Sequence, residues 1–171
     1  KLEWLTIRSI HFNNFSLKEA LSLSSFPPMG DGQRLSIRAQ ANGRRYQSYT
    51  FSFSEPWLGG RKPNSFGMSY NYSIQRYIDP FTDRTQGSLS VSGVTVSLGR
   101  RANWPDDFFV ISNSVSISKY RLFDYPQFSL GFATGDANSI VFNTTVSRRS
   151  SDNPMYPQRG SDLSVSVNLT P

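Results

Sequence analysis

Apolar and polar residues alternate along most of this chain, which is the pattern of β-strands with one apolar and one polar face. From Phe66 to Gln75 every even position is apolar or aromatic, and every odd position is glycine or polar. Residues 161–169 repeat the pattern, with leucine or valine alternating with serine or asparagine. The same alternation predicts further strands, about eight in all, at residues 4–13, 34–42, 45–54, 88–100, 107–121 and 139–149. We therefore expect an all-β fold with no helix longer than a turn or two.

Turn-forming residues separate the predicted strands. Asn42-Gly43 is the signal of a tight hairpin, because both residue types accept the positive φ angles of a two-residue turn. Longer loops are predicted where proline, glycine or aspartate cluster, at residues 27–32, 56–63 and 79–80. Successive strands with short connections predict an antiparallel meander, in which the Asn42-Gly43 turn and the Pro56 loop lie at opposite ends.

The alternation changes phase once inside a predicted strand. Leu89 and Val91 occupy odd positions, whereas Val94 and the apolar residues after it occupy even ones. One extra residue in a strand re-phases it, and glycine tolerates the dihedral angles that this requires. We therefore predict a β-bulge at Gly93.

Alternating strands of this kind build either membrane barrels or soluble β-sandwiches. A barrel is favoured by strands of about ten residues or more, which are long enough to cross a bilayer when tilted. It is also favoured by small uncharged polar residues, as in the serines from Ser112 to Ser118, which suit a wet lumen. Aromatic residues crowd the predicted strand ends, where interfacial girdles lie, at Trp57, Trp104, Phe108, Phe109, Tyr120 and Tyr125. A soluble sandwich, in which the apolar face fills a core between two sheets, remains the alternative.

The composition limits the other classes of protein. With 171 residues the chain has the length of about one domain. Aromatic residues make up 14% and charged residues only 18%, which excludes a disordered chain. The net charge of +6 could indicate a nucleic-acid partner, but the arginine pairs are scattered near strand ends rather than gathered on one element, so we expect no nucleic-acid binding.

Catalytic and metal-binding patterns are missing from the sequence. There is no cysteine and a single histidine, His11, which is better explained as a strand residue than as a catalyst. No Gly-x-Ser-x-Gly elbow or phosphate-binding loop is present. Aspartates in predicted turns have turn capping as their ordinary role and calcium binding as the alternative, namely Asp31, Asp79, Asp83, Asp106, Asp107 and Asp136. We expect a protein that is not an enzyme and that needs no cofactor or metal.

Several motifs resemble one known family. The run from Phe51 to Phe66 resembles a strand–loop–strand signature of the BamA outer-membrane assembly factor family. Residues 98–107 support the resemblance, and residues 12–15 and 152–161 are similar to the end of the family's first barrel strand and to the segment that enters its eighth. The residues that carry the resemblance most directly are Glu55, Pro56, Trp57, Gly99, Arg100, Arg101, Trp104, Pro105, Arg159 and Gly160.

The resemblance implies a sixteen-stranded antiparallel transmembrane β-barrel, of which residues 1–171 would form the N-terminal half. No segment that resembles the family's POTRA domains precedes Lys1, and Arg159-Gly160-Ser161 differs from the family's Arg-Gly-Phe motif. We therefore expect a piece of a longer protein, whose eight strands leave two open edges.

The function implied by the resemblance is the insertion and folding of β-barrel proteins into the bacterial outer membrane, without a cofactor. The implied partners are unfolded barrel proteins, outer-membrane lipids including lipopolysaccharide, and accessory assembly subunits. The family's first barrel strand forms a seam, where an incoming strand can pair by β-augmentation. That seam corresponds here to Trp4, Leu5, Thr6, Ile7, Arg8, Ser9, Ile10, His11, Phe12 and Asn13. The alternatives are an ordinary closed strand in a passive pore or structural barrel, and a soluble β-sandwich binding module.

Overall fold

The computed structural model describes residues 5–22, 29–58, 64–79, 81, 84–124, 134–151 and 159–171. Within these ranges the chain forms eight β-strands and one short helix. The elements are β1 (Leu5–Phe15), α1 (Leu17–Ser22), β2 (Met29–Asn42), β3 (Tyr46–Glu55), β4 (Asn64–Ile78), β5 (Thr85–Arg101), β6 (Phe109–Phe123), β7 (Thr134–Arg149) and β8 (Asp162–Leu169). No helix among the described residues is long and apolar enough to cross a bilayer.

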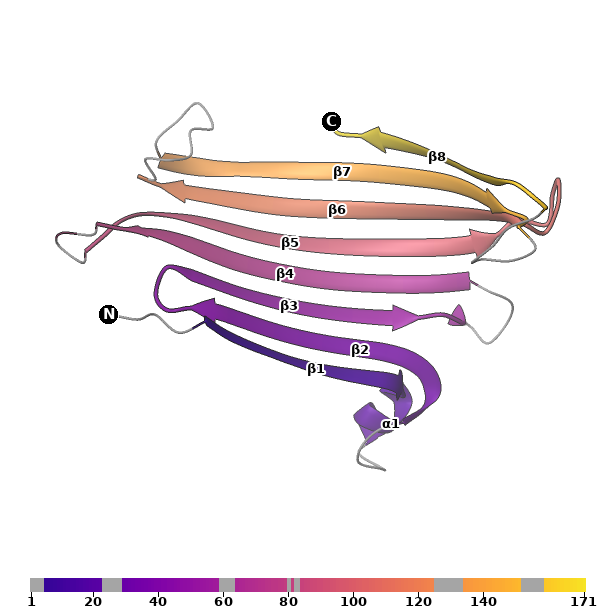
Figure 1. Cartoon of the computed structure of the whole chain (residues 1–171), viewed down its shortest axis with the longest axis horizontal. Coiled ribbons are helices and arrows are strands. Elements are labelled where there is room, and N and C mark those ends of the chain that lie inside the picture. Colours follow the sequence, from indigo (N-terminus) through magenta and orange to yellow (C-terminus); the bar gives the residue numbers. More distant parts are fainter. Residues whose placement is uncertain are drawn as a thin grey trace.

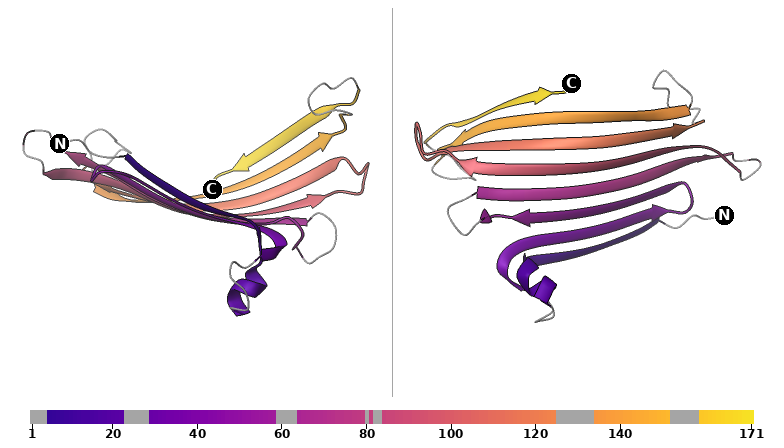
Figure 2. Two further views of the ribbon diagram at one scale, coloured as in Figure 1. Left: turned by 60° about the horizontal axis from the view of Figure 1, so that its bottom comes forward. Right: turned by 180° about the vertical axis from the view of Figure 1, so that it is seen from behind.

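All eight strands belong to one antiparallel sheet whose spatial order is the order of the sequence, β1 to β8 (Figure 1). Each strand pairs with the next, which confirms the predicted all-β meander. The sheet is curved and open, with β1 and β8 at its two edges (Figure 2). Successive connections alternate between the two ends of the sheet. One end, here called the long-loop end, holds α1 and the β3–β4, β5–β6 and β7–β8 connections, and the other, the short-turn end, holds the β2–β3, β4–β5 and β6–β7 connections.

Two strands extend into segments for which the sequence predicts turns or loops. β2 begins at Met29, so residues 29–32 are strand rather than loop. β7 begins at Thr134, which places Asp136 inside a strand and not in a turn. The carboxylate of Asp136 is accommodated there because Lys119 on β6 lies 3.0 Å from it. The cross-strand ion pair replaces the turn-capping role that was expected of this residue.

The predicted bulge at Gly93 is wrong. The register of β5 runs unbroken through this glycine, which lies opposite Asn71 on β4 and opposite Ser118 on β6. A Cβ at Gly93 would lie 2.8 Å from Oδ1 of Asn71. A side chain at this position would require the Asn71 side chain to move, whereas the register of the strand would not change.

The change of phase in β5 instead places two apolar residues on the polar face of the sheet. Leu89 pairs with Leu122 of β6, whose side chain is only 3% exposed, and Val91 lies two residues further along the same face. The actual register shift occurs between Tyr77 and Ile78 of β4. The local apolar cluster at the short-turn end therefore accounts for the pattern that resembled a bulge.

The two faces of the sheet differ sharply in chemistry, because residues that pair across strands point to the same side. Two rows across the sheet are apolar, one from β1 to β7 and the other from β1 to β8, and we call them the apolar belt. The first row is Ile10, Ile37, Phe51, Tyr70, Val94, Ile117 and Ile140, and the second is Phe12, Leu35, Phe53, Met68, Val96, Val115, Phe142 and Leu169. Most of these side chains are exposed, so the belt is an outer surface and not the core of a two-layer sandwich.

The opposite face carries mainly serine, threonine, asparagine and glycine. Its side chains form hydrogen bonds across strands, as between Thr95 Oγ1 and Ser116 Oγ at 2.9 Å and between Thr145 Oγ1 and Ser166 Oγ at 2.9 Å. A curved sheet that is apolar on one side and lined by hydroxyl groups on the other has the two surfaces of a transmembrane barrel wall.

Candidate functional site

The predicted seam is the free edge of β1. Residues 5–13 pair with β2 in an unbroken register, from Leu5 opposite Asn42 to Asn13 opposite Arg34. Within the described part of the chain, no strand pairs with the other edge of β1. Since N–H and C=O groups alternate between the two sides of an antiparallel strand, about half of those on β1 point to the open edge. Trp4, the first predicted seam residue, lies outside the described residues.

Side chains on both faces of β1 are accessible beside this edge. Ser9, His11 and Asn13 lie on the polar face and are exposed, and His11 pairs with Ser36 of β2. The described residues contain no group of histidines and acids that could hold a metal ion. His11 lies within β1 on the polar face of the sheet, and its role as an ordinary strand residue stays a prediction.

The apolar face of the sheet is narrower on β1 than on β4. On β4, five successive positions of this face are apolar, namely Phe66, Met68, Tyr70, Tyr72 and Ile74. On β1 this face carries three apolar residues, Ile10, Phe12 and, after the register shift, Phe15, and the position before Ile10 is Arg8. The open edge thus coincides with a thin part of the apolar surface.

The far end of β1 is held in place by a chain of buried polar contacts. Ser16, directly after β1, is only 2% exposed. The backbone N–H of Leu17 donates to Oε1 of Gln33 at 2.8 Å, and Nε2 of Gln33 donates to Oε2 of Glu55. The other carboxylate oxygen of Glu55 accepts from the N–H of Trp57 at 3.3 Å. The Glu-Pro-Trp segment therefore fixes the end of β1 against β2 and β3.

The sequence predicts a strand over residues 45–54, and β3 ends one residue later at Glu55, but sequence reasoning missed Gln33. A signal was present in the sequence. Gln33 lies two residues before Leu35 and four before Ile37, at a position where the alternation calls for an apolar residue and a polar one stands instead. Gln33 is 8% exposed, and its amide can donate and accept at once. That property lets it bridge a backbone donor and a carboxylate.

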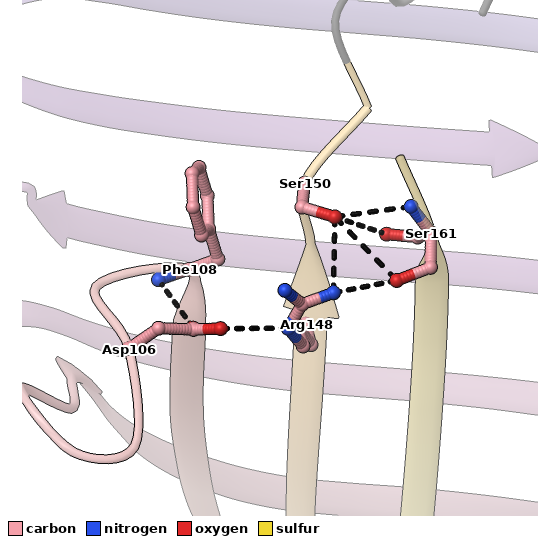
Figure 3. Close-up of polar contacts among 5 residues, drawn as sticks. All are labelled: Asp106, Phe108, Arg148, Ser150 and Ser161. Atoms are coloured by element: carbon pink, nitrogen blue, oxygen red, sulfur yellow. Dashed lines mark hydrogen bonds and ion pairs between the residues drawn. The ribbon is translucent and has the colours of Figure 1, made fainter. Parts of the chain in front are cut away.

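A second polar network joins strands at the long-loop end of the sheet (Figure 3). Nε of Arg148 on β7 lies 2.9 Å from Oδ2 of Asp106, and its Nη1 donates to the hydroxyl groups of Ser150 and Ser161. Oδ1 of Asp106 accepts from the N–H of Phe108 at 3.0 Å, which confirms the turn-capping role expected of this aspartate. One guanidinium thereby connects the β5–β6 loop to the segments that flank β7 and β8.

The remaining motif residues lie at the same end. Gly99, Arg100 and Arg101 form the end of β5 and line a cavity of about 960 Å³. Trp57 and Trp104 are 57% and 84% exposed, as expected of residues near an interface.

Arg159 and Gly160 precede β8. Gly160 has a φ of 107°, and a Cβ there would lie 2.3 Å from the carbonyl oxygen of Ser150. All ten motif residues are therefore at the long-loop end, whereas the predicted seam runs along the edge of the sheet.

Comparison with known proteins gives two matches. The Omp85 superfamily domain matches residues 29–171, a range that begins with β2. The structure of BamA from Haemophilus ducreyi lacking POTRA domains 1-3 is similar, with a TM-score of 0.56 and 16% sequence identity. That alignment covers 97% of this chain and 31% of the BamA chain, so the open sheet corresponds to part of a barrel. A search of curated proteins gives no match.

Proposed function

The chain belongs to the Omp85 superfamily, and from this premise we propose that the free edge of its first strand promotes the insertion and folding of β-barrel proteins in the bacterial outer membrane. The observation that supports this most directly is that, among the described strands, β1 pairs with β2 alone. In lipid, each backbone group that lacks a hydrogen-bond partner costs several kcal/mol. A strand from an unfolded barrel protein satisfies such groups on β1 and on itself when it adds to this edge.

The far end of β1 is suited to act as a fixed pivot in this mechanism. Gln33 and Glu55 hold the segment after Phe15, while residues 5–13 pair with β2 alone among the described strands. The edge can then exchange its partner strand without loss of its attachment to the sheet. Because main-chain groups do the pairing, the mechanism accepts substrates of varied sequence.

We further propose that the protein is not an enzyme. Strand pairing requires no nucleophile, cofactor or metal, only donors and acceptors at an edge. The proposed partners are unfolded barrel proteins, outer-membrane lipids including lipopolysaccharide, and accessory assembly subunits.

A passive pore is the competing function, and the hydroxyl-lined face favours it. Serine, threonine and asparagine side chains would line an aqueous channel equally well. In that case β1 would pair permanently with the closing strand of the barrel and would have no role in exchange.

A disulfide lock distinguishes the two functions. In the full-length protein, Ser9→Cys is combined with a cysteine in the closing strand, and a matched control places cysteines at Ser69 and Thr95, which already pair between β4 and β5. This chain contains no cysteine of its own, so the introduced pair is unambiguous within it. The seam lock should stop insertion of a second barrel protein, whereas the control lock should not.

Heat-modifiable mobility in gels verifies that both locked proteins are folded. Normal insertion by a fully crosslinked, folded seam variant would rule out the seam and leave the passive barrel as the better account.

A further inference from the structure

The apolar face of one strand, β6, becomes cationic towards the short-turn end of the sheet. On β6, Lys119 and Arg121 occupy the first and second positions of this face beyond Ile117 of the apolar belt. Each step of two residues is about 6–7 Å along the strand. Arg8 on β1 lies on the same row across the sheet as Lys119. Arg8 is five strands away from Lys119, so we call only Lys119 and Arg121 the cationic band.

The band has more positive than negative charge. Nζ of Lys119 lies 3.0 Å and Nε of Arg121 lies 3.6 Å from the same oxygen of Asp136. Two cations therefore share one carboxylate, and the side chains of Lys119 and Arg121 are 40% and 65% exposed. A net positive charge remains accessible on this pair of strands.

Hydroxyl groups lie beside these cations. Ser92 of β5 pairs with Lys119, and Ser90 pairs with Arg121. A phosphate group is bound in proteins by this combination of cationic and neutral donors. The apolar belt sets the depth of these cations in the membrane. Ile117 of the belt lies in the hydrocarbon region when the barrel is in a membrane, so the cations beyond it lie near the edge of that region.

We propose that the cationic band binds the phosphate of anionic phospholipids in the leaflet at the short-turn end of the barrel. The long side chains of Lys119 and Arg121 reach from the edge of the hydrocarbon region to the headgroups. The acyl chains of the same lipid lie against the belt, so a lipid makes both contacts, which free phosphate does not. The proposal requires that the barrel lies in a membrane and does not require that it inserts other proteins.

The test uses the full-length protein in nanodiscs that contain phosphatidylcholine and phosphatidylglycerol in equal amounts. After mild detergent extraction, mass spectrometry quantifies the retained lipids, and no substrate protein is present. Lys119→Gln/Arg121→Gln should reduce the enrichment of phosphatidylglycerol by about fivefold or more. Arg34→Gln/Arg38→Gln, which removes the same charge from the polar face, should change it less than twofold.

A third variant strengthens the site and so does not depend on a loss of folding. Asp136→Asn frees both cations, and phosphatidylglycerol enrichment should rise. The proposal is overturned if the double variant retains the enrichment, if the polar-face control loses it equally, or if Asp136→Asn has no effect. It is also overturned if millimolar inorganic phosphate displaces the lipid, or if the same cations instead select lipopolysaccharide.

Discussion

β1 and β4 are built from the same alternating pattern but occupy different places in the sheet. β4 pairs with β3 and β5 along almost its whole length, and its apolar face carries five successive apolar positions. Among the described strands β1 pairs with β2 alone, and its apolar face carries three apolar residues beside Arg8, namely Ile10, Phe12 and Phe15. The comparison teaches that alternation specifies a strand and its two faces, whereas pairing on one side or on both decides where that strand lies. A strand paired on one side is an edge, and a strand paired on both sides is part of what we call the wall.

The largest expected effect concerns the centre of the wall. Tyr70→Arg places a charge in the apolar belt, and it should destabilise the barrel by about 2–4 kcal/mol if this row lies at the bilayer midplane. Asn71→Arg is the matched control, because it places the same charge one residue away on the polar face. Urea unfolding of the full-length protein in vesicles measures both values. Equal destabilisation by the two variants would contradict the assignment of the faces.

Proline replacements separate an edge from a wall. On β1, N–H groups point alternately to β2 and to the open edge, so Ser9→Pro and Ile10→Pro remove donors on opposite sides. One of them should cost about 1–3 kcal/mol of stability, while the other should leave stability nearly unchanged and still impair insertion. Ser9→Ala should have little effect on either.

The same pair of changes on β4 is the control for this prediction. Asn71→Pro and Tyr72→Pro should both destabilise, because β4 has neighbours on both sides. Unfolding midpoints and insertion rates provide the readouts. If both prolines on β1 destabilise as strongly as those on β4, the first strand does not have a free edge in the full-length protein.

Much of the wall could be predicted from local sequence, because alternation and turn residues are local signals. Residues 66–75 have the predicted faces, and β3 ends at Glu55, one residue after the predicted end. The contacts that position the edge could not be predicted in the same way. Gln33 meets Leu17 and Glu55, which are 16 and 22 residues away, and these meetings depend on how the strands align.

The errors have the same cause. The odd positions of Leu89 and Val91 resembled a bulge because their partners, Leu122 and Tyr120, are recognisable only once β5 and β6 are paired. Asp136 resembled a turn residue because its partners Lys119 and Arg121 lie on the neighbouring strand. The local sequence pattern predicts the face of the sheet on which a side chain lies, whereas the strand register determines which side chain lies opposite it on the neighbouring strand.

Loss of the contacts that attach β1 should reduce stability by less than a charge in the wall does, but by a measurable amount. Gln33→Ala leaves the Leu17 N–H and the Glu55 carboxylate without their shared partner, and it should cost about 1–3 kcal/mol. Gln40→Ala, on the same strand but outside this network, is the control. Hydrogen exchange should show faster exchange in β1 than in β4 for the Gln33 variant. Uniform acceleration across the sheet would show that Gln33 supports the whole sheet and not the edge in particular.

The smallest effect is expected at the opposite side of the sheet, where two ion pairs of equal length can be compared. Arg148–Asp106 and Arg149–Asp162 both have an Nε–Oδ2 distance of 2.9 Å. The side chains of the first pair are 27% and 33% exposed, and those of the second are 73% and 54% exposed. Asp106 also caps the β5–β6 loop, so Asp106→Asn removes a partly buried charge interaction that belongs to a network.

Asp106→Asn should therefore cost about 1 kcal/mol, whereas Asp162→Asn should cost less than about 0.5 kcal/mol because solvent and salt screen the more exposed pair. Urea unfolding at low and high salt measures the difference. The cost of Asp162→Asn should disappear in high salt, while part of the cost of Asp106→Asn should persist. Asparagine can still cap Phe108 through Oδ1, but the amide NH2 that replaces Oδ2 cannot accept the directed hydrogen bond from Nε of Arg148. If both variants lose their entire effect in salt, the network of Figure 3 holds the loop through charge alone. A persistent cost at Asp106 would show instead that this end of the sheet is tied together by directed hydrogen bonds, the kind of interaction that the free edge of β1 still has available for a partner.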